Sequence, residues 1–149
     1  PIVVDIDDEK LGMARQLGAS ATINSSEEGA AEKLMELTEG GARSIVDFVG
    51  AEASVNFGYN LLARGGSYVI VGLFGGQISI PLPMQALLEK KLMGSYVGSL
   101  GDMAELMELV VAGKIDPVAV ETRDVSQANE TLEQMKDGKL LGLVALTHN

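Results

Sequence analysis

The sequence predicts an α/β fold, a doubly wound parallel sheet with helices on both sides. Short apolar segments alternate along its 149 residues with amphipathic stretches of helical period. The first apolar segment, IVVDI at 2–6, stops at Asp5 and is followed at once by a helix start. Small residues, at Val49–Gly50 and Gly72–Leu73, follow two later strands, where a flat ligand can approach the backbone.

The opening segment predicts one strand, one helix and a second strand. After the strand at 2–6, Asp7 or Asp8 is expected to cap a helix, because a side-chain oxygen there accepts from free backbone N–H groups. Gly18 is expected to end this helix. The segment SATIN at 20–24 then predicts a brief second strand.

The next segment predicts a helix followed by a buried strand. Ser25 or Ser26, with Glu28 close behind, is expected to open a helix within 29–41, whose apolar residues recur on one face. The strand SIVDFVG at 44–50 follows directly. A β-α-β order is therefore already established by residue 50.

The middle of the chain predicts the most deeply buried strand. A helix over about 53–63 leads through RGG to SYVIVGLF at 67–74, a continuous apolar run of the kind found where both sheet faces are covered. Beyond it, alternation at 78–80 predicts a short exposed strand, closed by Pro81 and Pro83.

The last third repeats the same alternation. The segment 92–99 lies between two helices, and the final strand, LLGLVALT at 140–147, is again almost wholly apolar. Ser126 is expected to cap the last helix, and Gly138 to end it. The predicted helices lie at 84–90, 102–112 and 126–135, and an extended segment lies at 117–125.

Composition and charge argue against several classes of function. A chain of this length, 46% hydrophobic and 21% charged, is expected to form one domain over 1–149, without a membrane span or secretory signal and located in the cytoplasm. The net charge of −10, with scattered basic residues, argues against nucleic-acid binding. With no Cys and only His148, the chain offers no credible zinc site. The acidic residues from Asp5 to Glu9 suit a helix start better than a calcium loop.

Asp5 is the leading candidate binding residue. A carboxylate at the carboxyl end of the second strand of a doubly wound sheet can accept hydrogen bonds from both ribose hydroxyls of an adenosine, and it repels a 2′-phosphate. The alternative is that Asp5 merely stabilises its strand-to-helix turn. A glycine-rich phosphate loop is not found, and the glycines near Val49 and Leu73 have an equally simple interpretation as loop or helix caps.

The order of five motifs indicates a family. VVDIDDEKLGMARQLGA, VDFVGA, LLARGGSYVIVGL, GSYVGS and KLLGLVAL follow one another over essentially the whole chain. Together they resemble the NAD-binding, Rossmann-like half of medium-chain, zinc-dependent alcohol dehydrogenases. The resemblance implies that the first strand and phosphate-loop helix of this fold, and the catalytic domain with its zinc, lie upstream of a truncated chain.

The resemblance also implies roles for particular residues. Asp5 and Lys10 would lie at the adenosine ribose, although Lys10 also suits a solvated first helical turn. Tyr96 would help to close over the nicotinamide, or would instead be a core aromatic. The complete implied cofactor set comprises Asp5, Lys10, Val49, Gly50, Val71, Gly72, Leu73, Ser95, Tyr96 and Val97. No catalytic residue is expected in this chain.

Two departures from the family pattern affect binding and folding. Leu143 stands where many relatives have a basic residue that holds the pyrophosphate. The absent first strand would be central, so its neighbours at 2–6 and 44–50 would keep unpaired backbone groups. We expect these two strands to pair directly, to receive a strand from another chain, or to loosen.

The function implied by the resemblance is hydride transfer between an alcohol or carbonyl substrate and NAD in the intact parent, with this chain alone inactive. Two alternatives stay open: a zinc-free quinone or enoyl reductase, and a catalytically silent self-association module. In relatives, the segment around Ile78 and Ile80 pairs with its twin, so we also expect a homodimer or tetramer.

Overall fold

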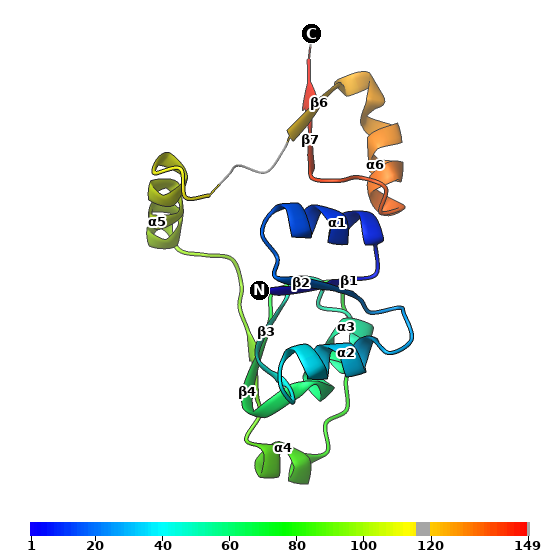
Figure 1. Ribbon diagram of the computed structural model, residues 1–149. Coiled ribbons are helices and arrows are strands. Elements are labelled where there is room, and N and C mark those ends of the chain that lie inside the picture. The colour runs from blue at the N-terminus through cyan, green and yellow to red at the C-terminus, as the bar shows by residue number, and fades with distance from the viewer. Residues whose placement is uncertain (116–119, 149) are drawn as a thin grey trace. The chain divides into compact units, whose positions relative to one another are not determined.

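The computed structural model describes residues 1–115 and 120–148. These form two compact units, Pro1–Val97 and Gly98–Asn149, and each is considered by itself. All strand pairs described are parallel and are connected through helices (Figure 1). The predicted α/β class with parallel strands is therefore confirmed, whereas a single domain over 1–149 stays a prediction.

The first strands and helix form as predicted. Strand β1 (Ile2–Asp5) pairs in parallel with β2 (Ala21–Asn24), and α1 (Asp8–Gln16) connects them. Asp7 is the N-cap of α1, and its Oδ1 accepts from the backbone N–H groups of Glu9 at 2.9 Å and Lys10 at 3.3 Å. The capping prediction was therefore correct for Asp7.

Helix α2 (Ala30–Leu37) does not begin at a capping serine. Its N-cap is Gly29, which has a φ of 81° and makes no side-chain cap. Ser26 is held instead by Asn24, whose Oδ1 accepts from the Ser26 backbone N–H at 3.0 Å and from its hydroxyl at 2.5 Å. The predicted Ser25 or Ser26 cap was wrong because Ser26 closes a turn after β2.

The first unit also contains a three-stranded sheet. Its order is β3-β4-β5, from β3 (Ala42–Asp47), β4 (Leu62–Ile70) and β5 (Lys91–Gly94). Helix α3 (Glu52–Asn60) connects β3 to β4, and α4 (Leu82–Leu88) precedes β5. The buried cluster of α3 and β4 comprises Val55, Tyr59, Leu62 and Tyr68. Strand β4 begins five residues before the predicted apolar run because its first residues pair with β3 across an irregular register.

The predicted strand at 78–80 is absent. That segment has no strand assignment, and Ile78 and Ile80 instead pack against the cluster between α3 and β4. The alternation was correctly identified as a one-sided apolar pattern. The strand assignment was wrong because these side chains pack on the chain's own core without a neighbouring strand.

Strands β1 and β3 do not pair with each other. In the part of the chain that the structure describes, β1 has only β2 as its partner, and β3 has only β4. Phe57 and Leu61, from α3 and the residue after it, instead pack against a buried cluster of Ile23, Ala30 and Leu34. Direct pairing is therefore excluded as the way in which the predicted gap is closed.

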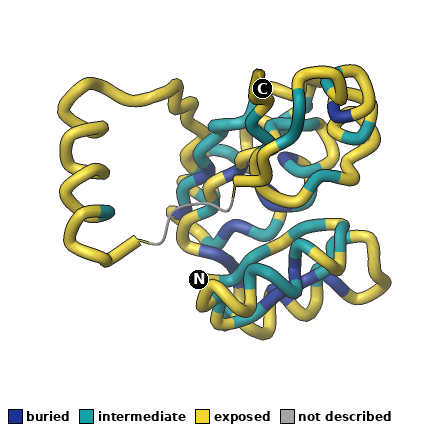
Figure 2. Tube along the Cα trace, turned by 90° about the horizontal axis from the view of Figure 1, so that it is seen from above, coloured by how far each residue is buried: buried dark blue, intermediate teal, exposed yellow. Residues whose placement is uncertain are grey.

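The second unit contains α5 (Leu100–Val111), β6 (Val120–Asp124), a short 3₁₀ turn (Val125–Gln127), α6 (Ala128–Lys136) and β7 (Leu143–Thr147). Ser99 caps α5, and residues along most of this helix are exposed (Figure 2). The predicted cap of α6 by Ser126 was wrong, because Asp124 Oδ1 accepts from its backbone N–H and its hydroxyl. Residues 117–119 of the predicted extended segment lie outside the described residues.

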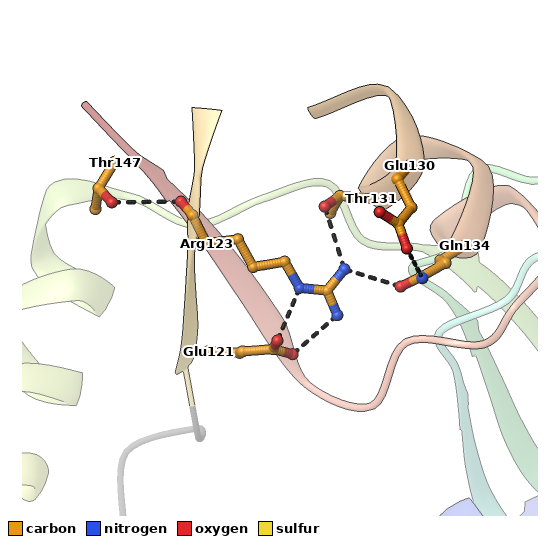
Figure 3. A network of polar contacts seen from close by, with 6 residues as sticks. All are labelled: Glu121, Arg123, Glu130, Thr131, Gln134 and Thr147. Atoms are coloured by element: carbon orange, nitrogen blue, oxygen red, sulfur yellow. Dashed lines mark hydrogen bonds and ion pairs between the residues drawn. The ribbon is translucent and has the colours of Figure 1, made fainter. Parts of the chain in front are cut away.

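Arg123 connects β6 to α6. Its guanidinium donates to both carboxylate oxygens of Glu121, at 2.7 and 3.0 Å, and to Thr131 at 3.2 Å and Gln134 at 2.8 Å (Figure 3). The backbone carbonyl of Arg123 also accepts from the Thr147 hydroxyl of β7. One side chain thus joins a strand to its crossover helix.

No helix in residues 1–115 or 120–148 is long and apolar enough to cross a membrane.

Candidate functional site

The loops that follow β3 and β4 are hydrogen-bonded to each other at the carboxyl ends of the strands. The carbonyl of Asp47 accepts from the N–H groups of Val71 at 2.8 Å and Gly72 at 3.0 Å. Further along the loop after β3, the carbonyl of Val49 accepts from the Phe74 N–H at 3.1 Å, and the carbonyl of Gly50 accepts from the Gly75 N–H at 3.0 Å. The structure therefore brings together the predicted residues Val49, Gly50, Val71, Gly72 and Leu73.

Two glycines make this approach possible. Gly50 has a φ of 65°, and a Cβ placed there would lie 2.0 Å from the Gly72 oxygen. A Cβ at Gly72 would lie 2.1 Å from the carbonyl carbon of Val49. Neither position has space for a side chain, so the simple interpretation of these glycines as ordinary loop caps does not describe them.

Asp47 holds the loop after β3 through its carboxylate, in which each oxygen accepts two hydrogen bonds. Its Oδ1 accepts from the N–H groups of Val49 at 2.8 Å and Gly50 at 3.0 Å. Its Oδ2 accepts from the hydroxyls of Ser54 at 2.8 Å and Tyr68 at 2.9 Å. Asp47 is only 6% exposed.

The environment shifts the pKa values of both Asp47 and Tyr68. Burial by itself would raise the pKa of Asp47, but the hydrogen bonds from Gly50, Ser54, Val49 and Tyr68 outweigh it, so this pKa lies below its ordinary value. Burial, followed by the hydrogen bond and negative charge of Asp47, raises the pKa of Tyr68. The pair is therefore a carboxylate and a neutral phenol at neutral pH.

The segment after β5 lies at the same edge of the sheet. The Ser95 N–H donates to the Ile70 carbonyl at the end of β4, at 2.9 Å. Tyr96 is 76% exposed, so its alternative interpretation as a core aromatic was wrong. Val97 is similarly exposed and has a φ of 45°, which is uncommon for a branched residue.

Asp5 takes part in its own turn. Its Oδ1 accepts from the N–H groups of Ile6 at 2.8 Å and Asp7 at 3.0 Å, and the residue is half-buried. Within the described chain, its Oδ2 has no hydrogen bond. The turn interpretation is thus correct for one oxygen, and the ribose interpretation stays a prediction for a carboxylate with one free oxygen.

Lys10 lies in the first turn of α1, as a solvated lysine would. Its Nζ is 3.9 Å from Asp7 Oδ2, and both side chains are partly exposed. Asp5 and Lys10 belong to the β1-β2 pair, and no hydrogen bond between described residues joins them to the loops after β3 and β4. Their role at a ribose stays a prediction.

Large apolar side chains surround these strand ends and are exposed to solvent. They are between 72% and 83% exposed, and they comprise Ile6, Phe48, Leu73, Phe74 and Tyr96. Soluble monomers seldom gather such side chains without a partner or ligand. Flat aromatic rings of a ligand are well matched to an apolar surface with a few backbone polar groups.

Sequence reasoning missed Asp47, Ser54 and Tyr68. A signal existed, because Asp47 ends a strand two residues before Val49, where an Asp side chain commonly bonds to the backbone N–H two residues on. The contribution of Ser54 and Tyr68 depends on the packing of α3 on β4, which the local sequence does not reveal.

The described residues offer no metal site: in 1–115 and 120–148, no group of three or more His, Cys, Asp or Glu residues is placed to hold an ion.

Comparisons with known proteins agree with this architecture. Residues 1–112 match the family model described as zinc-binding dehydrogenase. The chain is 33% identical over 142 residues to an NAD-dependent alcohol dehydrogenase of Sulfurisphaera tokodaii, covering 95% of this chain and 41% of that protein. An NAD-dependent alcohol dehydrogenase of Sulfolobus acidocaldarius is 36% identical, with the same coverage of both chains.

A solved structure shows the same fold. The crystal structure of the alcohol dehydrogenase from Aeropyrum pernix matches with a TM-score of 0.89 at 34% identity, over 97% of this chain and 42% of that one. The chain therefore spans about two-fifths of the length of the relatives it matches.

Proposed function

Because the chain belongs to the family of zinc-binding dehydrogenases, we propose that it is the NAD-binding part of an alcohol dehydrogenase. In the intact enzyme the reaction is hydride transfer between an alcohol, or the corresponding carbonyl compound, and the nicotinamide ring. The observation that supports this most strongly is the contact between the loops at Gly50 and Gly72, where the backbones of two strand ends approach closely beside an exposed apolar surface.

The residues present fit this cofactor. Val49 and Gly50 are proposed to flank the adenine, and Asp5 to accept from the ribose hydroxyls. Val71, Gly72 and Leu73 are proposed to present backbone groups to the nicotinamide carboxamide, with Ser95, Tyr96 and Val97 on its other side. NAD supplies the hydride acceptor, whereas this chain supplies binding and orientation.

Zinc is proposed to be bound by a catalytic domain outside this chain. The chain has no Cys and one His, so it lacks the ligands that a zinc site requires. The chain alone is therefore expected to bind the cofactor but not to catalyse the reaction.

The zinc-free quinone or enoyl reductase is the weaker alternative. Relatives at 33% and 36% identity are named NAD-dependent alcohol dehydrogenases. Asp5 also favours NAD, because a carboxylate at the ribose repels the 2′-phosphate of NADPH.

Fluorescence titration of the purified chain with NADH tests the proposal. We expect saturable binding in the micromolar range, and weaker binding of NADPH. Asp5→Asn should weaken NADH binding by about tenfold or more, since a hydrogen bond to a charged group contributes about 1.5–3 kcal/mol and 1.4 kcal/mol is tenfold. Glu9→Gln, which removes a carboxylate from the adjoining first turn of α1, is the matched control and should bind as the unmodified chain does.

Two outcomes would contradict the proposal in different ways. No saturable binding at millimolar NADH would support the silent self-association module instead. Equal NADH binding by Asp5→Asn, with an unchanged NADPH ratio, would remove Asp5 from the site and leave the rest of the proposal standing.

Self-association and location complete the proposal. We expect a homodimer or tetramer, because β1 and β3 each have one strand partner in the described residues and many apolar side chains are exposed. Sedimentation velocity that shows only monomer at tens of micromolar would contradict this. We expect a cytoplasmic location, where NAD is available, and cell fractionation tests it.

A further inference from the structure

The carboxylate of Asp47 is more constrained than a loop cap needs to be. Two backbone N–H groups satisfy Oδ1, which alone would close the turn. The hydroxyls of Ser54 from α3 and Tyr68 from β4 also fix Oδ2. The carboxylate therefore cannot rotate about its Cβ–Cγ bond without breaking hydrogen bonds in a site that is almost closed to water.

This constraint fixes the backbone of Val49 and Gly50. Both N–H groups point to Asp47, and both carbonyls accept from the loop after β4. With its polar backbone atoms satisfied internally, this segment presents the half-exposed side chain of Val49 to solvent. Such a surface suits the apolar face of a flat base.

Asp47 also holds the second loop. Its carbonyl accepts from Val71 and Gly72, while its side chain holds Val49 and Gly50. A single residue thus sets the spacing between the proposed adenine and nicotinamide segments. Ligand-binding precision depends on such supporting contacts, because displacements of about 1 Å weaken a site considerably.

We propose that Asp47 is a positioning residue for the dinucleotide, which acts through the backbone of Val49 and Gly50 and does not touch the ligand. This inference rests on the proposed NAD-binding function. It assigns to a buried carboxylate the preorganisation of the adenosine end of the site.

Three variants separate positioning from general stability. Asp47→Ala removes all four hydrogen bonds of the carboxylate. Asp47→Asn is the conservative rescue, because its Oδ1 still accepts from the two N–H groups while its Nδ2 donates to the oxygens of Ser54 and Tyr68. Tyr59→Phe is the stability control, since it removes the partly buried hydrogen bond from Tyr59 to Gln85 at the edge of the same core, away from the loops.

Two measurements are made on each variant: the NADH dissociation constant and the amide exchange rates of Val49 and Gly50. In Asp47→Ala we expect weaker NADH binding by about tenfold or more, and faster exchange at both amides relative to Ile23 in the core of β2. Asp47→Asn should restore most of the NADH affinity and most of the protection of the two amides from exchange. Tyr59→Phe should lower the melting temperature without changing the NADH dissociation constant or the amide exchange rates of Val49 and Gly50.

The outcomes distinguish this inference from the proposed function. If the unmodified chain does not bind NADH, the proposed function fails, and the positioning role fails with it. If the unmodified chain binds NADH and Asp47→Ala binds equally well, only the positioning role is overturned.

The positioning role can still be tested if Asp47→Ala does not fold. If Asp47→Ala shows no cooperative unfolding, Ser54→Ala replaces it, because this change removes one of the two hydrogen bonds to Oδ2 while the bond from Tyr68 and the two bonds to Oδ1 remain. We expect faster exchange at Val49 and Gly50 and weaker NADH binding. Unchanged exchange and affinity in Ser54→Ala would overturn the inference.

Discussion

Gly72 shows how strongly single positions determine this site. Its Cα lies so close to the neighbouring loop that an added Cβ would be 2.1 Å from the carbonyl carbon of Val49 and 2.3 Å from its oxygen. Both atoms are backbone, so the neighbour cannot turn away as a flexible side chain would. The contact between the two loops therefore excludes every side chain at this residue.

We expect Gly72→Ala to destabilise the chain by about 2 kcal/mol or more, because overpacking against a fixed backbone forces the loops apart. Gly12→Ala is the matched control. Gly12 lies within α1 and has nothing within 4 Å of its added Cβ, so alanine there should stabilise the helix by roughly 0.5–1 kcal/mol. Urea unfolding measures both, and equal stability of Gly72→Ala and the unmodified chain would contradict the observed loop contact.

The pKa of Asp47 predicts how stability depends on pH. Hydrogen bonds hold this pKa below its ordinary value of 3.8, so the folded chain binds the proton less readily than the unfolded chain. The stability that Asp47 contributes is therefore present above pH 3.8 and is lost as pH falls below it through the folded pKa. The other carboxylates also titrate in acid, so a comparison between variants is needed.

The relevant quantity is the difference in free energy of unfolding between the unmodified chain and Asp47→Asn. We expect a constant difference from pH 7 down to about pH 4, and a smaller difference at lower pH, since the variant has no carboxylate at this position. Denaturant unfolding at each pH measures it. A difference that grows in acid would mean that the carboxylate is not stabilised by its hydrogen bonds.

At the residue scale, the sequence drew attention to one of two similar aspartates. Asp5 and Asp47 both end a strand of apolar residues, and each has an oxygen that accepts from backbone N–H groups of its own turn. The prediction singled out Asp5 because of its place in the strand order. Asp47 was missed because its second oxygen is satisfied by residues seven and twenty-one positions away, which only tertiary packing brings near.

At the element scale, Arg123 connects a strand and a helix that would otherwise share few polar contacts. Arginine can hold Glu121 through two parallel hydrogen bonds and still reach Thr131 and Gln134 on α6, because its donors are arranged in a rigid plane. The lysine side chain has a single nitrogen and cannot donate to Glu121, Thr131 and Gln134 in this arrangement.

We therefore expect Arg123→Lys to loosen α6 from β6 even though the charge is kept. Amide exchange across Ala128–Lys136 should become faster than in the unmodified chain, while exchange in α3 stays the same. Lys136→Arg, a change between the same residue types at the end of α6, is the control and should leave exchange unaltered. Unchanged exchange in α6 of Arg123→Lys would show that apolar packing alone holds this helix.

Element prediction succeeded where local chemistry decides the outcome. The apolar strands and the Asp7 cap follow from hydrophobic pattern and hydrogen-bonding needs within a few residues. It failed at Ser26, at Ser126 and at 78–80. Ser26 and Ser126 each donate to the side chain of a neighbouring Asn or Asp residue and do not cap a helix. The apolar side chains at 78–80 pack against the core of the same chain.

At the scale of the whole molecule, the arrangement of strands was the least predictable feature. The parallel class followed from the alternation of elements, but which strands are neighbours depends on pairings between distant segments. Of the three ways proposed to close the gap between β1 and β3, direct pairing is excluded, and a strand from another chain or local loosening stay predictions. All four residues of β5 are exposed, as are the apolar side chains at the strand ends.

The central claim is that the carboxyl ends of β1, β3, β4 and β5 together form a dinucleotide site. Chemical-shift mapping of the isotopically labelled chain with NADH tests it most directly, because each backbone amide reports on its own surroundings. We predict saturable shifts at Ile6, Val49, Gly50, Gly72 and Ser95, with much smaller shifts in α4 and α6. Saturable shifts confined to α4 or α6, or none at millimolar NADH, would contradict the account.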